Sequence, residues 1–144
     1  MMPQFSVFNR TYDETIDLMV EAKNYLAYAD ERERKKVDPV SGIKMSCEAM
    51  RVTSRLVQVM AWLMMQRAVQ EGEITVDTAM TEENRLSNGD VCLNVGPCQE
   101  CFIPMRLRSL LDRSLSLYVR ISRIEEQILR RIDEEHQFTT RGSC

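Results

Sequence analysis

Three cysteines form the densest group of side chains in the sequence that could do chemistry. Cys92, Cys98 and Cys101 lie within ten residues, and the last two have the CxxC spacing that holds zinc or forms a redox pair. A structural zinc site needs four ligands, and the distant candidates for the fourth are Cys47, Cys144 and His136. A single CxxC is a weak signal, so we favour unligated loop thiols and predict no metal or cofactor. A metal- or thiol-regulated helical domain is the alternative function.

Other residue types that could support catalysis are sparse. The only histidine, His136, lies close to the C-terminal end, whereas acid–base and nucleophilic chemistry usually need a positioned base. The five glycines are scattered singly, so the sequence has neither a phosphate loop nor a dinucleotide-binding fingerprint. We therefore predict that the protein is not an enzyme.

A line of polar residues on the central helix is the candidate site. At helical spacing its members fall within about 80° of one another, and they are Arg51, Arg55, Gln58, Trp62 and Gln66. Arginine and tryptophan are enriched at interface hot spots, so we predict a partner-binding surface here. Tryptophans are usually largely buried, and the alternative for Trp62 is a structural contact with a strap or a second subunit.

The helix that carries this line is predicted over residues 44–72. Its apolar residues fill an arc of roughly 200°, whereas a surface helix needs only about 100°. Met45, Val52 and Leu56 belong to this arc, and so do Val57 and Met64. The width predicts two covering layers, the neighbours in a bundle and a second subunit.

Two further long helices complete the predicted bundle. The first spans about residues 11–34, because Thr11 and Glu14 have capping-box spacing, and the other spans about 104–135, after Pro104. Between the second and third helices we expect a short helix from Thr75 to about Asn84 and an extended strap over 91–95, and residues 137–144 should fray. The prediction is a single all-α domain, 1–144, folded as an antiparallel bundle of three long helices that forms a homodimer.

Charge divides the predicted bundle into an acidic and a basic helix. Residues 13–33 hold seven acids against two bases, and residues 106–131 hold seven arginines against three acids. These two helices should therefore be neighbours. Acids accompany the arginines and no aromatic side chains alternate with them, so we predict no binding to nucleic acid.

Composition indicates where the protein resides. The formal charge is −3, the N-terminus lacks the pattern of an export signal, and no apolar run is long enough to span a membrane. An odd number of cysteines without an export signal is typical of reduced cytosolic thiols. We expect a cytoplasmic protein without a membrane partner.

The central segment, AMRVTSRLVQVMAWLMMQRAVQEGEIT, resembles the RcdA family of alphaproteobacterial regulators of CtrA degradation, also known as DUF1465. Met50-Arg51, Ala61-Trp62-Leu63 and Gln66-Arg67-Ala68-Val69 are among the matching positions, and a weaker likeness runs from Pro104 to Ile124. The tail QFTTRGSC is shorter than the tails of the family, and the cluster of cysteines matches no family motif.

This resemblance implies a homodimeric three-helix bundle without catalytic activity. It implies an adaptor that presents cell-cycle regulators and other cargo to the ClpXP protease. The implied partners are a ClpX-type unfoldase, a response-regulator-like co-adaptor and the cargo regulators, in some species at a cell pole.

Overall fold

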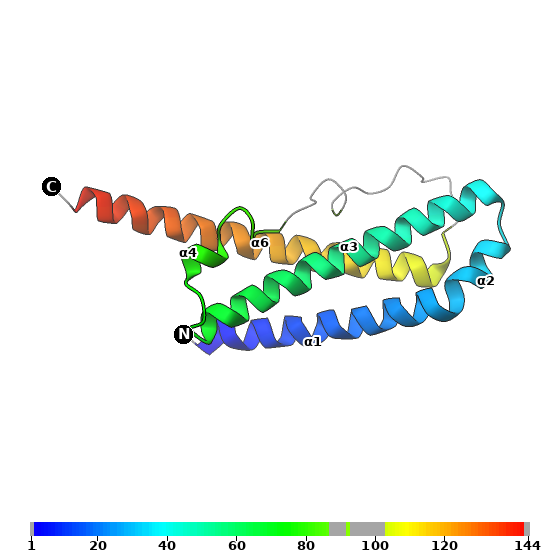
Figure 1. Cartoon of the computed structure of the whole chain (residues 1–144), viewed down its shortest axis with the longest axis horizontal. Helices are drawn as coiled ribbons and strands as arrows, with labels where there is room; N and C mark the ends of the chain where they lie inside the picture. The colour runs from blue at the N-terminus through cyan, green and yellow to red at the C-terminus, as the bar shows by residue number, and fades with distance from the viewer. Residues whose placement is uncertain (1, 87–91, 93–102, 143–144) are drawn as a thin grey trace.

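The computed structural model describes residues 2–86, 92 and 103–142, and every regular element in these ranges is helical. The chain forms α1 (Met2–Asn24), the π-helical turn η1 (Tyr25–Ala29), α2 (Asp30–Lys35), α3 (Pro39–Gln70), α4 (Val76–Ala79) and α6 (Met105–Arg141). The long helices α1, α3 and α6 lie side by side along the molecule (Figure 1). The predicted all-α class is confirmed.

The first helix begins at Met2, well before the predicted start at Thr11. Thr11 is buried within α1, and its carbonyl oxygen accepts a hydrogen bond from the Thr15 hydroxyl at 2.7 Å. The spacing of Thr11 and Glu14 imitates a capping box, and a proline such as Pro3 is tolerated in a first helical turn. The prediction of a helix start at Thr11 is therefore wrong.

The central helix begins at Pro39, before the predicted residue 44. Asp38 caps it, because its carboxylate accepts hydrogen bonds from the Ser41 backbone N–H at 3.2 Å and the Ser41 hydroxyl at 2.6 Å. Pro39 and Gly42 lie in the first turns of this helix. After Gln70 the chain turns at Gly72, whose φ of +78° is the left-handed conformation common after helices.

The ends of the other helices also differ from the prediction. Thr75 caps α4 as expected, its hydroxyl accepting a hydrogen bond from the Thr78 N–H at 3.2 Å, but α4 ends at Ala79. The last helix continues to Arg141, so residues 137–141, predicted to fray, are helical. Of the predicted strap over 91–95, only Cys92 lies within the described residues.

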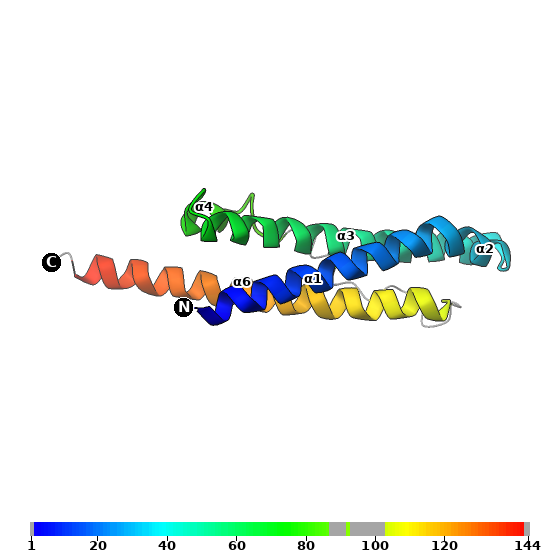
Figure 2. The same cartoon turned by 90° about the horizontal axis from the view of Figure 1, so that it is seen from below.

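Helix α1 runs antiparallel to both α3 and α6, but α3 and α6 run parallel to each other (Figures 1 and 2). The antiparallel prediction is therefore wrong for this pair. Two described residues between α4 and α6 contact the long helices. The Leu86 N–H donates to Glu125 Oε2 in the middle of α6 at 2.9 Å, and Cys92 lies beside Arg55 of α3.

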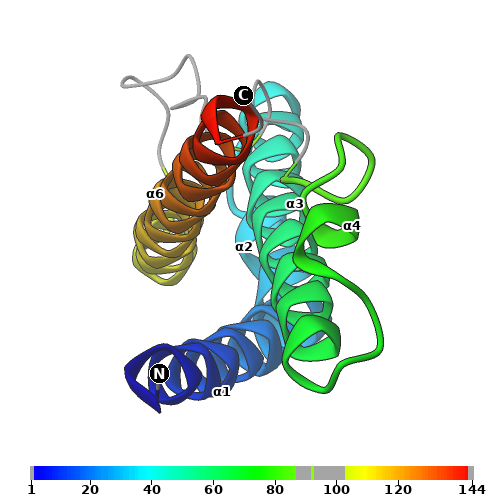
Figure 3. The same cartoon turned by 90° about the vertical axis from the view of Figure 1, so that its left-hand side faces the viewer.

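The core consists of side chains that α1, α3 and α6 direct toward one another, and Figure 3 shows these helices end-on. Leu18 and Ala22 come from α1, Tyr25 from η1 directly after it, and Val59 from α3. Leu107, Leu110, Leu117 and Ile121 come from α6. Their three- and four-residue spacing is the periodicity from which the sequence predicted the helices.

Candidate functional site

The predicted polar line on α3 is largely inside the molecule. Arg55 and Trp62 are each only 2% exposed and Gln66 only 6%, whereas Arg51 and Gln58 are half-buried. The premise of a solvent-facing line is therefore wrong for three of its five members. The cause is that α6 packs against Arg55 and α1 packs against Trp62.

Arg55 is a buried connector between three parts of the chain. Its Nε donates to the Cys92 carbonyl at 2.6 Å, and its Nη1 donates to the Leu111 carbonyl at 2.9 Å and the Ser114 hydroxyl at 3.2 Å. Burial lowers the pKa of Arg55, and repulsion from Arg51 adds to this. The guanidinium group thus links α3 to α6 and to Cys92.

Trp62 makes a structural contact, although its partner is α1 and not the strap or second subunit of the alternative prediction. Its ring meets the Phe8 ring of α1 edge to face, with centroids 5.9 Å apart. One turn further along α3, the buried Gln66 also points away from bulk solvent. The Trp62 Nε1 and Gln66 Nε2 atoms are buried without a hydrogen-bond partner among the described residues.

Two of the five cysteines, Cys47 and Cys92, lie within the described residues. Cys92 is fully buried, and burial raises the pKa of its thiol. Its neighbour Tyr118 has a pKa raised to about 12, mainly by burial. Cys98 and Cys101 lie outside the described residues, and residues 2–86, 92 and 103–142 contain no group of three His, Cys, Asp or Glu that could hold an ion.

His136 lies on the surface of α6. Its Nε2 is 3.9 Å from Asp77 Oδ1 of α4, and the side chains are 69% and 73% exposed. Such an exposed pair has neither the burial nor the positioned nucleophile of a catalytic centre. It marks instead the place where α4 approaches α6.

The acidic and basic helices are neighbours, as predicted. Arg113 of α6 pairs with Glu21 of α1 at 2.6 Å, and Arg120 pairs with Glu14 at 2.9 Å. The hydrogen bond from Arg113 lowers the pKa of Glu21. Because these side chains are more than 40% exposed, each pair contributes at most about 1 kcal/mol. The pairs fix the antiparallel placement of α1 on α6.

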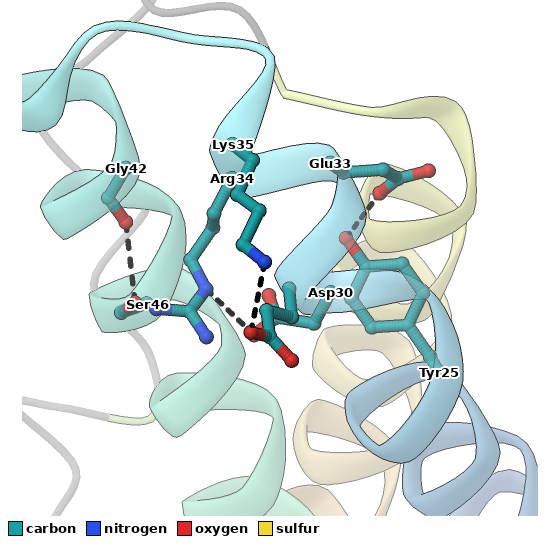
Figure 4. Close-up of polar contacts among 8 residues, drawn as sticks. Tyr25, Asp30, Glu33, Arg34, Lys35, Gly42 and Ser46 are labelled. Carbon is teal, nitrogen blue, oxygen red and sulfur yellow. Dashed lines mark hydrogen bonds and ion pairs between the residues drawn. The ribbon is translucent and has the colours of Figure 1, made fainter.

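A polar cluster stabilises the elbow that connects α1 to α3 (Figure 4). The Tyr25 hydroxyl donates to Glu33 Oε2 at 2.6 Å, and Arg34 Nε donates to Asp30 Oδ2 at 2.9 Å. Burial, followed by the bond to Glu33, raises the pKa of Tyr25. The Asp30 N–H donates to the Tyr25 carbonyl five residues earlier. This spacing is typical of a π-helix, whose turn is wider than that of an α-helix. These bonds are local and hold the shape of the elbow.

Part of the wide apolar arc predicted on α3 lies on the surface of the bundle. Four residues at seven-residue intervals, which we call the heptad stripe, are 65%, 70%, 50% and 58% exposed, and they are Ile43, Met50, Val57 and Met64. On α1, Ile16 and Val20 are 37% and 51% exposed. The bundle thus leaves this part of the predicted arc uncovered.

Comparison with known proteins places this arrangement in a family. The model of DUF1465, described as a protein family of unknown function, matches residues 2–141. The chain belongs to the DUF1465 family. Its structure is similar to the crystal structure of RcdA from Caulobacter crescentus CB15, with a TM-score of 0.68 and 31% sequence identity over 84% of this chain and 89% of that one.

Two further comparisons complete this description. A search of curated protein sequences gave no match. Among the described residues, none of the helices has both the length and the apolar character needed to cross a membrane.

Proposed function

We propose that this DUF1465 protein is a non-enzymatic adaptor for regulated proteolysis. In this role it presents cargo, such as cell-cycle regulators, to the ClpXP protease in the cytoplasm. The observation that carries the proposal is the similarity to RcdA over most of both chains, in sequence and in fold. The family likeness of the central segment points to regulators of CtrA degradation, and an adaptor works through surfaces, without bond chemistry.

The proposal includes a homodimer formed through α3. The heptad stripe supports it, because four exposed apolar residues at seven-residue intervals are the pattern of a helix seam that packs on another helix. A second copy of α3 would offer the same stripe around a two-fold axis. Dimerisation would remove from water the half of the apolar arc that the bundle leaves exposed.

Partner contacts are proposed at the accessible edge of the polar line. Arg51 and Gln58 are half-buried, with 12% of the Arg51 side chain exposed, while the buried Arg55 and Trp62 contact α6 and α1. The partners are a ClpX-type unfoldase, a response-regulator-like co-adaptor and the cargo, and a location at a cell pole belongs to the same proposal.

Reconstituted proteolysis tests the adaptor function directly. Purified ClpX and ClpP would be mixed with ATP, a cell-cycle regulator such as CtrA and a response-regulator-like co-adaptor, with and without this protein. We expect the half-life of the regulator to shorten when the protein is present. The same reaction with Leu56→Asp, which puts a charge into the core, should show no acceleration.

A negative result has a clear form. If the folded protein neither changes the rate of degradation nor binds the unfoldase, the co-adaptor or the regulator, the adaptor proposal is wrong. Acceleration by Leu56→Asp equal to that by the natural sequence would assign the effect to a contaminant.

A further inference from the structure

A crevice of about 370 Å³ lies at one end of the bundle, where four helices meet. Apolar side chains from all four form its walls, and they are Phe8, Val69, Val76, Ile128 and Ile132. Gln66, Gln70, Asp77, Arg131 and Glu135 supply the polar part of the lining. It lies at the end where α4 packs beside α3 (Figures 1 and 3).

Gln66, which lines the crevice, is unusual because its polar side chain is buried without a partner for its Nε2 among the described residues. The side chain is 94% buried, since 6% is exposed. A buried donor that is left unsatisfied costs roughly 1–3 kcal/mol. The orientation of a glutamine amide is an assignment, so either its nitrogen or its oxygen can face the crevice. A ligand with both a donor and an acceptor suits either orientation, and a peptide group has both.

The charge around the crevice is predominantly acidic. Asp77 and Glu135 line it against Arg131. Glu73 is exposed in the segment between the lining residues Gln70 and Val76, where Glu71 is offset by Arg67 at 3.6 Å. Peptides with Lys or Arg are therefore favoured over acidic ones. The apolar walls, with a volume suited to one or two side chains, favour an apolar anchor residue beside the basic one.

We propose that this crevice binds a peptide segment of a protein partner, with an apolar side chain between the walls, a main-chain amide on Gln66 and a basic residue toward Asp77 and Glu135. This inference rests on the proposed adaptor function and names the site and the chemistry of one partner segment.

Selection from a phage-displayed library of linear dodecapeptides tests the proposal on the full-length protein. We expect enriched sequences to contain an apolar residue next to Lys or Arg. Fluorescence anisotropy with the enriched peptides would then compare Val76→Arg with Val40→Arg. Val76 lines the crevice and is 42% exposed, whereas Val40 is 59% exposed at the opposite end of α3. Val76→Arg should weaken binding by about tenfold or more, and Val40→Arg should leave it unchanged.

Gln66→Met separates ligand binding from a structural role. It removes an unsatisfied amide and keeps the side-chain length, so the melting temperature should stay the same or rise. Affinity for the enriched peptides should nevertheless fall several-fold, because the peptide group loses its partner. A lower melting temperature with unchanged peptide affinity would overturn the assignment.

Two other outcomes also contradict the proposal. One is that no peptide is enriched, or that enriched peptides bind Val76→Arg as tightly as the natural sequence. The other is that Val76→Arg converts a dimer into a monomer, which would make the crevice an interface between copies. Reconstituted proteolysis distinguishes the two proposals, because acceleration that survives Val76→Arg leaves the adaptor function standing without this site.

Discussion

Replacing Arg55 should destabilise the protein strongly, although arginine substitutions are usually mild. Arg55→Ala removes three hydrogen bonds made by a charged group and leaves the Cys92 carbonyl without this donor. Hydrogen bonds to charged groups contribute about 1.5–3 kcal/mol each. Relief from burying a charge offsets part of the loss, so we expect a net cost of about 3–5 kcal/mol.

Urea unfolding followed by circular dichroism measures this cost. Arg123→Ala is the matched control, because Arg123 is exposed on α6 and its replacement should change the free energy of unfolding by less than about 0.5 kcal/mol. Arg55→Met, which keeps most of the volume and removes the donors, should cost less than Arg55→Ala. If Arg55→Ala costs under about 1 kcal/mol and instead abolishes binding of a partner, Arg55 is a surface residue and the reasoning is refuted.

The other predictions concern the exposed stripe, the ion pairs and the cysteines. Val57→Asp should leave the helical content unchanged and convert a dimer into a monomer in light scattering; a dimer that survives contradicts the seam on α3. Glu21→Gln should cost less than about 1 kcal/mol at neutral pH. The pKa of Glu21 is lowered by folding, so its contribution is present above the unfolded pKa and is lost as the pH falls through the folded one, and the variant should lose less stability on acidification. Iodoacetamide should modify the exposed Cys47 much faster than the buried Cys92, measured by mass spectrometry, and equal rates would contradict the burial of Cys92.

The parts of the fold that could be predicted are those encoded by local periodicity and by charge. The three long helices follow from apolar spacing, and the contact of α1 with α6 follows from their opposite charges. The start of α1 and the direction of α6 relative to α3 could not be read in this way. Direction depends on the path of the connection, where short-range patterns carry little information.

The burial of Arg55 shows why the candidate site was harder to predict than the helices. It donates to the backbone carbonyl oxygens of Cys92 and Leu111, and every residue has such an oxygen. No residue type at those positions signals a partner for an arginine. The spacing of arginine, glutamine and tryptophan along α3 is therefore the same whether these side chains face water or a neighbouring helix, and the sequence pattern does not distinguish the two cases.

Helix α3 thus has three faces: one packs in the core, one carries the heptad stripe and one lines the crevice. The two proposed binding surfaces lie on different sides of the helix. Met64 of the heptad stripe and Val69 of the crevice point about 140° apart on the helix, and the stripe shares no residue with the crevice lining. A copy of the chain docked on the stripe would therefore leave the crevice residues of both protomers available. Such a dimer would present two crevices, and a partner with two suitable segments would gain from binding both at once.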